Sequence, residues 1–174
     1  MKIAFVTGSS IVEGAVAAFE ILRELSEKYG HMLVDYRAKE PRSYVNSAIL
    51  AGKLLNEGEA DFVIGGCSSG LGFQLALNTC PNVLCGYGTT PIEAALFARI
   101  NKGNAFSYPF ALNWGWAAEE NFRFVIAALF QGMTEEIYPA KEAARKKSEN
   151  ESLKKLSQLS KVSYENWLKK VEKL

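Results

Sequence analysis

Eight residues around one cysteine carry the strongest chemical signal in the sequence. The segment Gly65-Gly66-Cys67-Ser68-Ser69-Gly70-Leu71-Gly72 follows a buried apolar run and opens directly into a helical pattern. Glycines allow positive φ and a close approach of the backbone to a ligand. The free N–H groups at the start of a helix point at whatever anion lies there. The segment therefore predicts a thiol beside a set of backbone donors, and a tight strand-to-helix turn is the simpler alternative.

A thiol in this position suits one kind of chemistry. A helix N-terminus stabilises a thiolate, and a thiolate can act as a general base that removes a proton from carbon. The N–H groups of Ser68 to Gly72 would stabilise the negative oxygen that develops beside that carbon. This is the chemistry of an enediolate, as in aldose–ketose isomerisation. The alternative for Cys67 is a small buried residue, which is the commoner role of a single cysteine.

Other well-known loops need residues that this sequence lacks. A phosphate-binding loop needs Gly-Lys-Ser/Thr at the helix start, and a dinucleotide fingerprint needs further glycines after the first strand, where Gly8 stands alone. A cysteine-dependent phosphatase loop would have an arginine six positions after Cys67, and that position is Phe73. A receiver domain would carry an aspartate in place of Cys67.

Composition sets broad limits on the class of protein. The chain has 174 residues, of which 48% are hydrophobic, and a net charge of +1, so we expect a soluble globular domain with or without an appendage. It has neither a run of about 20 apolar residues nor an apolar leader, and we expect no membrane partner and a cytoplasmic location. Three cysteines and one histidine, His31, are too few for a zinc site. The charge lacks the basic excess of a nucleic-acid binder.

The elements that must position Cys67 follow from apolar periodicity. Short apolar runs alternate with helical patterns along residues 1–133. This alternation predicts an α/β fold, a three-layer doubly wound (Rossmann-like) sheet of about five parallel strands in the order 2-1-3-4-5. Ligands of such sheets bind outside the carboxyl ends of the strands. The loops at that edge are residues 8–10, 37–42, 67–72 and 87–90.

Residues 134–174 differ in kind from the rest. They are rich in charge and read as two amphipathic helices, at 141–158 and 164–173. We expect a C-terminal helical extension, packed on the core or on a partner subunit. Lys141 and Arg145 in this extension, and Arg42 in the second loop, are candidate cations for an anionic ligand. The alternative for all three is a solvated charged surface.

The segment from Asp61 to Asn78 resembles the signature of ribose-5-phosphate isomerase type B and the related galactose-6-phosphate isomerase subunits. In that family a strand ends in a cysteine, followed by Gly-Thr-Gly-hydrophobic-Gly and a helix that ends in Ala-Ala-Asn. The opening Met1-Lys-Ile-Ala-Phe is also similar, and Asn101-Lys-Gly-Asn104-Ala resembles the family's His-Asn-Asp-x-Asn segment. The resemblance covers about residues 1–133.

The resemblance implies a phosphorylated sugar substrate, a pentose or hexose phosphate, and no metal or organic cofactor. It implies a homodimer or a dimer of dimers, in which Asn101 reaches the active site of the partner subunit. Cys67 would be the proton-abstracting base and Ser69 would retain the family's hydroxyl. The anion hole would comprise Ser68, Ser69, Gly70, Leu71 and Gly72.

Three family positions carry other residues in this chain. The family's Asp-His pair, which would contact substrate, falls at Gly8 and Ser9, and its ring-opening histidine falls at Ile100. Two alternatives to a self-sufficient isomerase therefore stay open. One is a sugar-phosphate-binding protein without catalysis, and the other is a subunit of a hetero-oligomeric isomerase.

Overall fold

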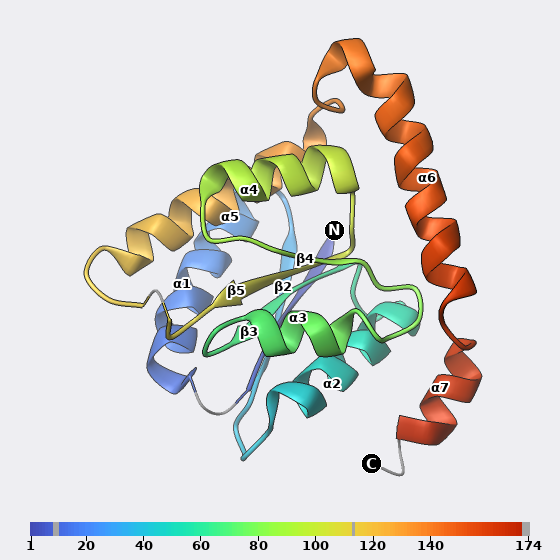
Figure 1. Ribbon diagram of the computed structural model, residues 1–174. Coiled ribbons are helices and arrows are strands. Elements are labelled where there is room, and N and C mark those ends of the chain that lie inside the picture. The colour runs from blue at the N-terminus through green and yellow to red at the C-terminus, as the bar shows by residue number, and fades with distance from the viewer. Residues whose placement is uncertain (9–10, 113, 172–174) are drawn as a thin grey trace.

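The computed structural model of the protein describes residues 1–8, 11–112 and 114–171. Within these residues, five parallel strands form one sheet in the order β2-β1-β3-β5-β4, with helices on both faces (Figure 1). The strands are β1 (Lys2–Thr7), β2 (Met32–Arg37), β3 (Phe62–Cys67), β4 (Cys85–Tyr87) and β5 (Ala105–Pro109). The predicted doubly wound α/β fold is confirmed.

The helices divide between the two faces of the sheet. The first face carries α1 (Val12–Lys28), α4 (Pro91–Leu96) and α5 (Ala118–Thr134), and the second carries α2 (Tyr44–Asn56), α3 (Leu71–Leu77) and α7 (Tyr164–Val171). Right-handed crossovers that run in opposite directions along a sheet place their helices on opposite faces. This rule accounts for α3 and α4 lying on different faces, because the chain moves out to β4 and then back to β5.

The order of the last two strands differs from the predicted one. β5 lies between β3 and β4, and β4 forms the edge of the sheet. All five residues of β5 are buried, whereas β4 has three residues and only Cys85 among them is buried. An interior position suits a fully buried strand, and a short strand suits an edge. Position along the chain alone does not distinguish the two orders.

Local signals fix the ends of the helices near the carboxyl edge. The Ser43 side chain accepts a hydrogen bond from Asn46 N (3.1 Å) and caps α2. Thr90 and Glu93 form a capping box at the start of α4, with Pro91 in the first turn. α4 continues into a π-helical turn, η2 (Phe97–Asn101).

No helix in the described ranges is both long and apolar enough to span a membrane.

The C-terminal helices return the chain along the β4 side of the sheet (Figure 1). α6 (Ala143–Leu159) has no buried residue, whereas α7 buries Trp167 in the apolar cluster of α2 and α3. Lys161 Nζ donates to Val83 O (2.8 Å) and Tyr164 Oη donates to Glu57 (2.6 Å). The last part of the extension is therefore anchored to the core.

We expect Trp167→Ala to release α7 from the core. Truncation of a buried aromatic side chain costs roughly 3–5 kcal/mol, and Trp167 is the buried residue of this short helix. Limited proteolysis should then cut between α6 and α7, with little change in circular dichroism. Leu159→Ala, at a side chain that is 85% exposed at the end of α6, is the control. Equal cleavage rates in Trp167→Ala and the native protein would contradict this docking.

His31 makes stability depend on pH. Its ring packs edge-on against Phe130, with 4.8 Å between the ring centroids. Burial lowers the pKa of His31, and the N-terminal ammonium group lowers it further. The unfolded chain therefore binds this proton more readily than the native chain does.

We expect the free energy of unfolding to fall as the pH drops below about 6.5, the ordinary pKa of histidine. Urea denaturation between about pH 8 and pH 5 measures this dependence. In His31→Gln the acid-side loss should be smaller. The same loss in both proteins would show that carboxylates, and not His31, set the dependence.

Candidate active site

Cys67 lies where a fully buried strand reaches the carboxyl edge of the sheet. All six residues of β3 are buried, and Cys67 is 8% exposed. Its side chain borders an open groove of about 630 Å³, which is within the size range of small-ligand sites. The groove is lined by Pro41, Arg42, Ser43, Tyr44, Cys67, Ser68, Ser69 and Gly72.

The loop after Cys67 is held by β5 and the residues that follow it. Cys67 O accepts from Phe110 N (3.1 Å), and Ser68 O accepts from Ala111 N (3.0 Å) and Leu112 N (2.9 Å). Ser107 Oγ donates to Gly70 O (2.7 Å). These bonds fix the backbone beside the thiol, which favours a preorganised site.

Fewer than the five residues of the predicted anion hole can donate an N–H group to an anion. Gly70 is the N-cap of α3 with φ of 74°, and its N–H is already bonded to Cys67 O (3.2 Å). Gly70 therefore contributes its left-handed conformation and not a donor. The N–H groups of the first helical turn, which includes Leu71 and Gly72, have no acceptor within the helix.

Two tyrosine rings flank this glycine loop. A methyl group built on Gly70 would lie 2.8 Å from Tyr87 Cε2, and one on Gly72 would lie 3.1 Å from the ring of Tyr44. A side chain at either position would crowd a tyrosine ring, and Gly70 also has a positive φ that favours glycine. Tyr44 begins α2 and Tyr87 ends β4. No motif in the sequence marks either tyrosine, although Tyr87 opens one of the four loops predicted at the ligand edge.

Negative charge gathers on one side of Tyr87. The Glu93 carboxylate accepts from Thr89 N (2.8 Å) and Thr90 N (3.0 Å), and these bonds lower its pKa. Burial raises the pKa of Tyr87, and the neighbouring charges of Glu93 and Cys67 raise it further. Tyr87 therefore keeps its proton at neutral pH.

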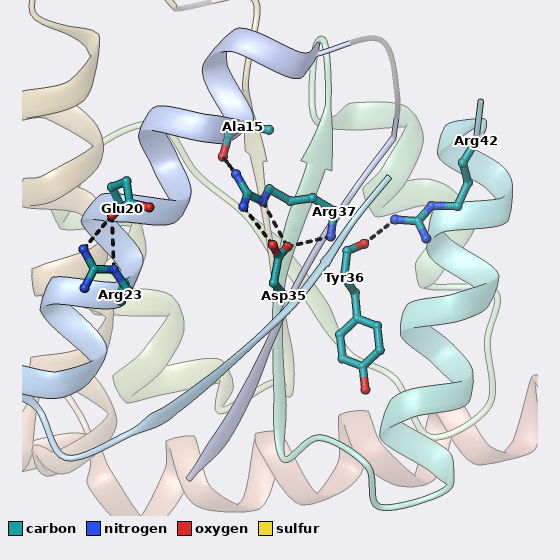
Figure 2. Close-up of polar contacts among 7 residues, drawn as sticks. All are labelled: Ala15, Glu20, Arg23, Asp35, Tyr36, Arg37 and Arg42. Atoms are coloured by element: carbon teal, nitrogen blue, oxygen red, sulfur yellow. Dashed lines mark hydrogen bonds and ion pairs between the residues drawn. The ribbon is translucent and has the colours of Figure 1, made fainter. Parts of the chain in front are cut away.

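Arg42 lines the groove but its guanidinium is engaged with the backbone. It donates to Tyr36 O, as Figure 2 shows. It also donates to Thr7 O (2.8 Å), and its Nε donates to Ser47 Oγ (3.2 Å). These contacts tie the loop before α2 to the ends of β1 and β2. Arg42 places a positive charge beside the groove, although burial lowers its pKa.

Gly8 lies on a different cavity from Cys67. This cavity, of about 190 Å³, is bordered by Gly8, Asp35, Arg37 and Lys39. Figure 2 shows Arg37 bonded to Asp35 through two nitrogens (2.7 and 3.0 Å) and also directed at Ala15 O. Gly8, at one position of the family's Asp-His pair, thus lies next to the Asp35–Arg37 ion pair, which was not predicted from the sequence. Ser9, the other predicted residue, lies outside the described residues.

The remaining predicted residues lie away from the Cys67 groove within one chain. Asn101 ends η2 and borders a second groove of about 480 Å³, together with Tyr87 and Glu93. Arg145 lies in α6 and pairs with Glu142 and Glu149. Lys141 lies in a 3₁₀ turn just before α6. The structure thus gathers Cys67, Ser68, Ser69, Gly72 and Arg42, and it leaves Asn101, Lys141 and Arg145 apart from them.

Comparisons with known proteins agree with this architecture. A family model described as Ribose/Galactose Isomerase matches residues 12–121. The crystal structure of a 4-deoxy-L-threo-5-hexosulose-uronate ketol-isomerase complexed with a tartrate is 34% identical to the chain, with a TM-score of 0.90. The alignment covers 98% of this chain and 82% of that one. No curated protein matches the sequence.

Ribose-5-phosphate isomerases are similar as well. The enzyme from Vibrio parahaemolyticus is 29% identical over 99% of this chain and 84% of its own, with a TM-score of 0.92. The enzyme from Thermotoga maritima, at 21% identity over 86% and 97% of the two chains and a TM-score of 0.67, shares the fold. These relatives are isomerases, and the family model spans more than half of the sequence. The chain therefore belongs to the ribose/galactose isomerase family, a family of sugar isomerases.

Proposed function

We propose that the protein interconverts an aldose and a ketose that carry an anionic group, through an enediolate, with Cys67 as the general base. The observation that carries this proposal is the position of Cys67, 8% exposed on a groove and followed at once by the first turn of α3. The thiolate removes the proton from the carbon next to the carbonyl. The N–H groups of Leu71 and Gly72 stabilise the oxygen that becomes negative.

A phosphorylated pentose or hexose is the first candidate substrate. Arg42 beside the groove favours an anion, and the similarity to the ribose-5-phosphate isomerase from Vibrio parahaemolyticus covers 84% of that enzyme. Ser69, which also borders the groove, retains a hydroxyl for the sugar oxygens.

A hexuronate, whose negative group is a carboxylate, is the second candidate. The ketol-isomerase at 34% identity is named for a uronate substrate. The groove also has Arg42 as its one lysine or arginine among the described residues, and much of that guanidinium is bonded to Thr7, Tyr36 and Ser47. A singly charged carboxylate requires less positive charge than a phosphate does.

A homodimer, or a dimer of dimers, would complete the site. Two large apolar side chains of α3, the helix that begins at the groove, are exposed: Leu71 (48%) and Leu75 (71%). A partner subunit that covered these side chains would bury apolar area. We propose that it also brings Asn101, and the cations Lys141 and Arg145, toward the groove.

Hydrogen exchange at carbon tests the reaction and the base together. Native protein in D₂O should exchange the hydrogen next to the carbonyl and form ketose from at least one sugar in a panel of pentose phosphates, hexose phosphates and hexuronates. Proton NMR follows both changes. Cys67→Ala should lower the rate by roughly 10²- to 10⁴-fold, the usual contribution of a general base.

Cys80→Ala is the matched control, because the Cys80 thiol lies against Gly52 beneath α2 and away from the groove. An unchanged rate in Cys67→Ala would refute the assigned base. Thermal stabilisation by a sugar without exchange would instead indicate a binding protein.

A further inference from the structure

A small cavity, called the α6 cavity below, lies between α6 and the amino ends of β4 and β5. Its volume is about 220 Å³. One wall comes from the turns that lead into β4 and β5, and the other is formed by Lys154, Ser157 and Gln158 of α6. The Cys67 groove, at the carboxyl ends of the strands, has a different set of lining residues. Sites of drug-sized ligands measure about 300–1,000 Å³, so the α6 cavity suits a small ion or one group of a metabolite.

Two lysines from distant parts of the chain line the α6 cavity. Lys102 directly follows η2, and Lys154 lies in α6. In the described part of the chain, no aspartate or glutamate lines the cavity, and neither lysine side chain forms an ion pair or a hydrogen bond. By contrast, Arg145 and Lys146 pair with nearby glutamates. Like charges that share a cavity repel each other, and an anion between them is attracted to both.

Hydrogen bonds fix the wall of the cavity on the core side. Asn104 Oδ1 accepts from Leu84 N (2.9 Å), and Asn104 Nδ2 donates to Asn82 O (2.8 Å). Asn82 Nδ2 in turn donates to Asn56 Oδ1 of α2 (2.9 Å). Lys102 therefore belongs to a preorganised wall, which favours binding of a ligand.

We propose that the α6 cavity binds a phosphate group between Lys102 and Lys154. The group is either inorganic phosphate or the end of a small phosphorylated metabolite. Lysine binds phosphate as a point charge, and a phosphate ester carries about −1.5 to −2 charges at neutral pH, enough to balance two lysines. The Ser157 hydroxyl and the Gln158 amide can donate hydrogen bonds to its oxygens. This site is independent of the proposed reaction at Cys67.

A bound phosphate would attach α6 to the core at a further point. α6 has no buried residue, and its Asn150 donates to the carbonyls of Ile100 (3.2 Å) and Asn101. Lys154 lies about one helical turn after Asn150, and Lys102 directly follows Asn101. The phosphate therefore extends, through ionic contacts, a junction that Asn150 begins. We expect an occupied cavity to reduce the opening of α6.

Titration of isotope-labelled protein with sodium phosphate at constant ionic strength, followed by amide NMR, tests the site. The amides of Gly103 and of residues 154–158 should shift along one saturable curve, with a Kd of about 10 mM or less. Lys102→Gln and Lys154→Gln should each weaken binding by roughly tenfold, because each removes one charged contact. Lys154→Arg keeps the charge and should bind within about threefold of native.

Lys155→Gln is the matched control, because Lys155 is the next lysine of α6, is exposed and lies outside the cavity lining. It removes the same charge and should leave the Kd unchanged. Equal weakening in Lys155→Gln, native-strength binding in either variant of the two cavity lysines, or no saturable shift up to about 50 mM phosphate would overturn the site. Shifts confined to Ser68–Gly72 would also overturn it, and would instead support an anion at the Cys67 groove, so the two proposals fail separately.

Hydrogen exchange of the α6 amides tests the attachment of this helix. At a phosphate concentration about ten times the native Kd, exchange through detachment of α6 should slow by up to about tenfold. In Lys154→Gln, whose Kd is then close to that concentration, the slowing should be about twofold or less. Unchanged exchange in the native protein would overturn the attachment.

Glycerol phosphate distinguishes the two sources of the phosphate group. Tighter binding of this ester than of inorganic phosphate indicates a phosphorylated metabolite, and equal or weaker binding indicates the free ion. Either result supports the site when Lys102→Gln and Lys154→Gln weaken both ligands. Binding of either ligand that is insensitive to both substitutions would overturn it.

Discussion

The backbone bonds between the Cys67 loop and β5 are the constraint on which the site depends. β3 lies between β1 and β5, and every one of its residues is buried. Where the strand ends, the carbonyls of Cys67 and Ser68 continue the pairing by accepting from residues 110–112. The thiol therefore lies on an interior strand bonded on both sides, and a regular element positions a reacting group better than a free loop does.

This constraint also explains why β5 occupies an interior position. β5 pairs with β3 on one side and with β4 on the other, and the Ser107 hydroxyl donates a hydrogen bond to the carbonyl of Gly70. With the order 2-1-3-4-5, the three-residue β4 would have lain beside β3. β4 at the edge instead leaves Tyr87 half-buried, with its ring over the glycine loop.

Sequence reasoning recovered the features that are encoded locally. The alternation of apolar runs and helical patterns gave the fold class, and the residues around Cys67 gave the loop and the helix that follows it. Contacts between distant elements could not be recovered in this way. The strand order depends on the relative burial of β4 and β5, and the bonds of Arg42 to Thr7 and Tyr36 require β1, β2 and the loop before α2 to be in place. The packing of Tyr87 against Gly70 and of Tyr44 against Gly72 could not be predicted for the same reason.

The C-terminal extension mechanically links two sides of the molecule. α6 has 17 residues, a rod about 25 Å long at 1.5 Å per residue, and none of them is buried. Near its middle, Asn150 donates to the carbonyls of Ile100 and Asn101 at the end of η2. Beyond its far end, Trp167 is seated among α2 and α3. A tilt of this rod would act both on the π-helical turn that borders the second groove and on the helices that follow Ser43 and Gly70, so these two regions are coupled through the extension.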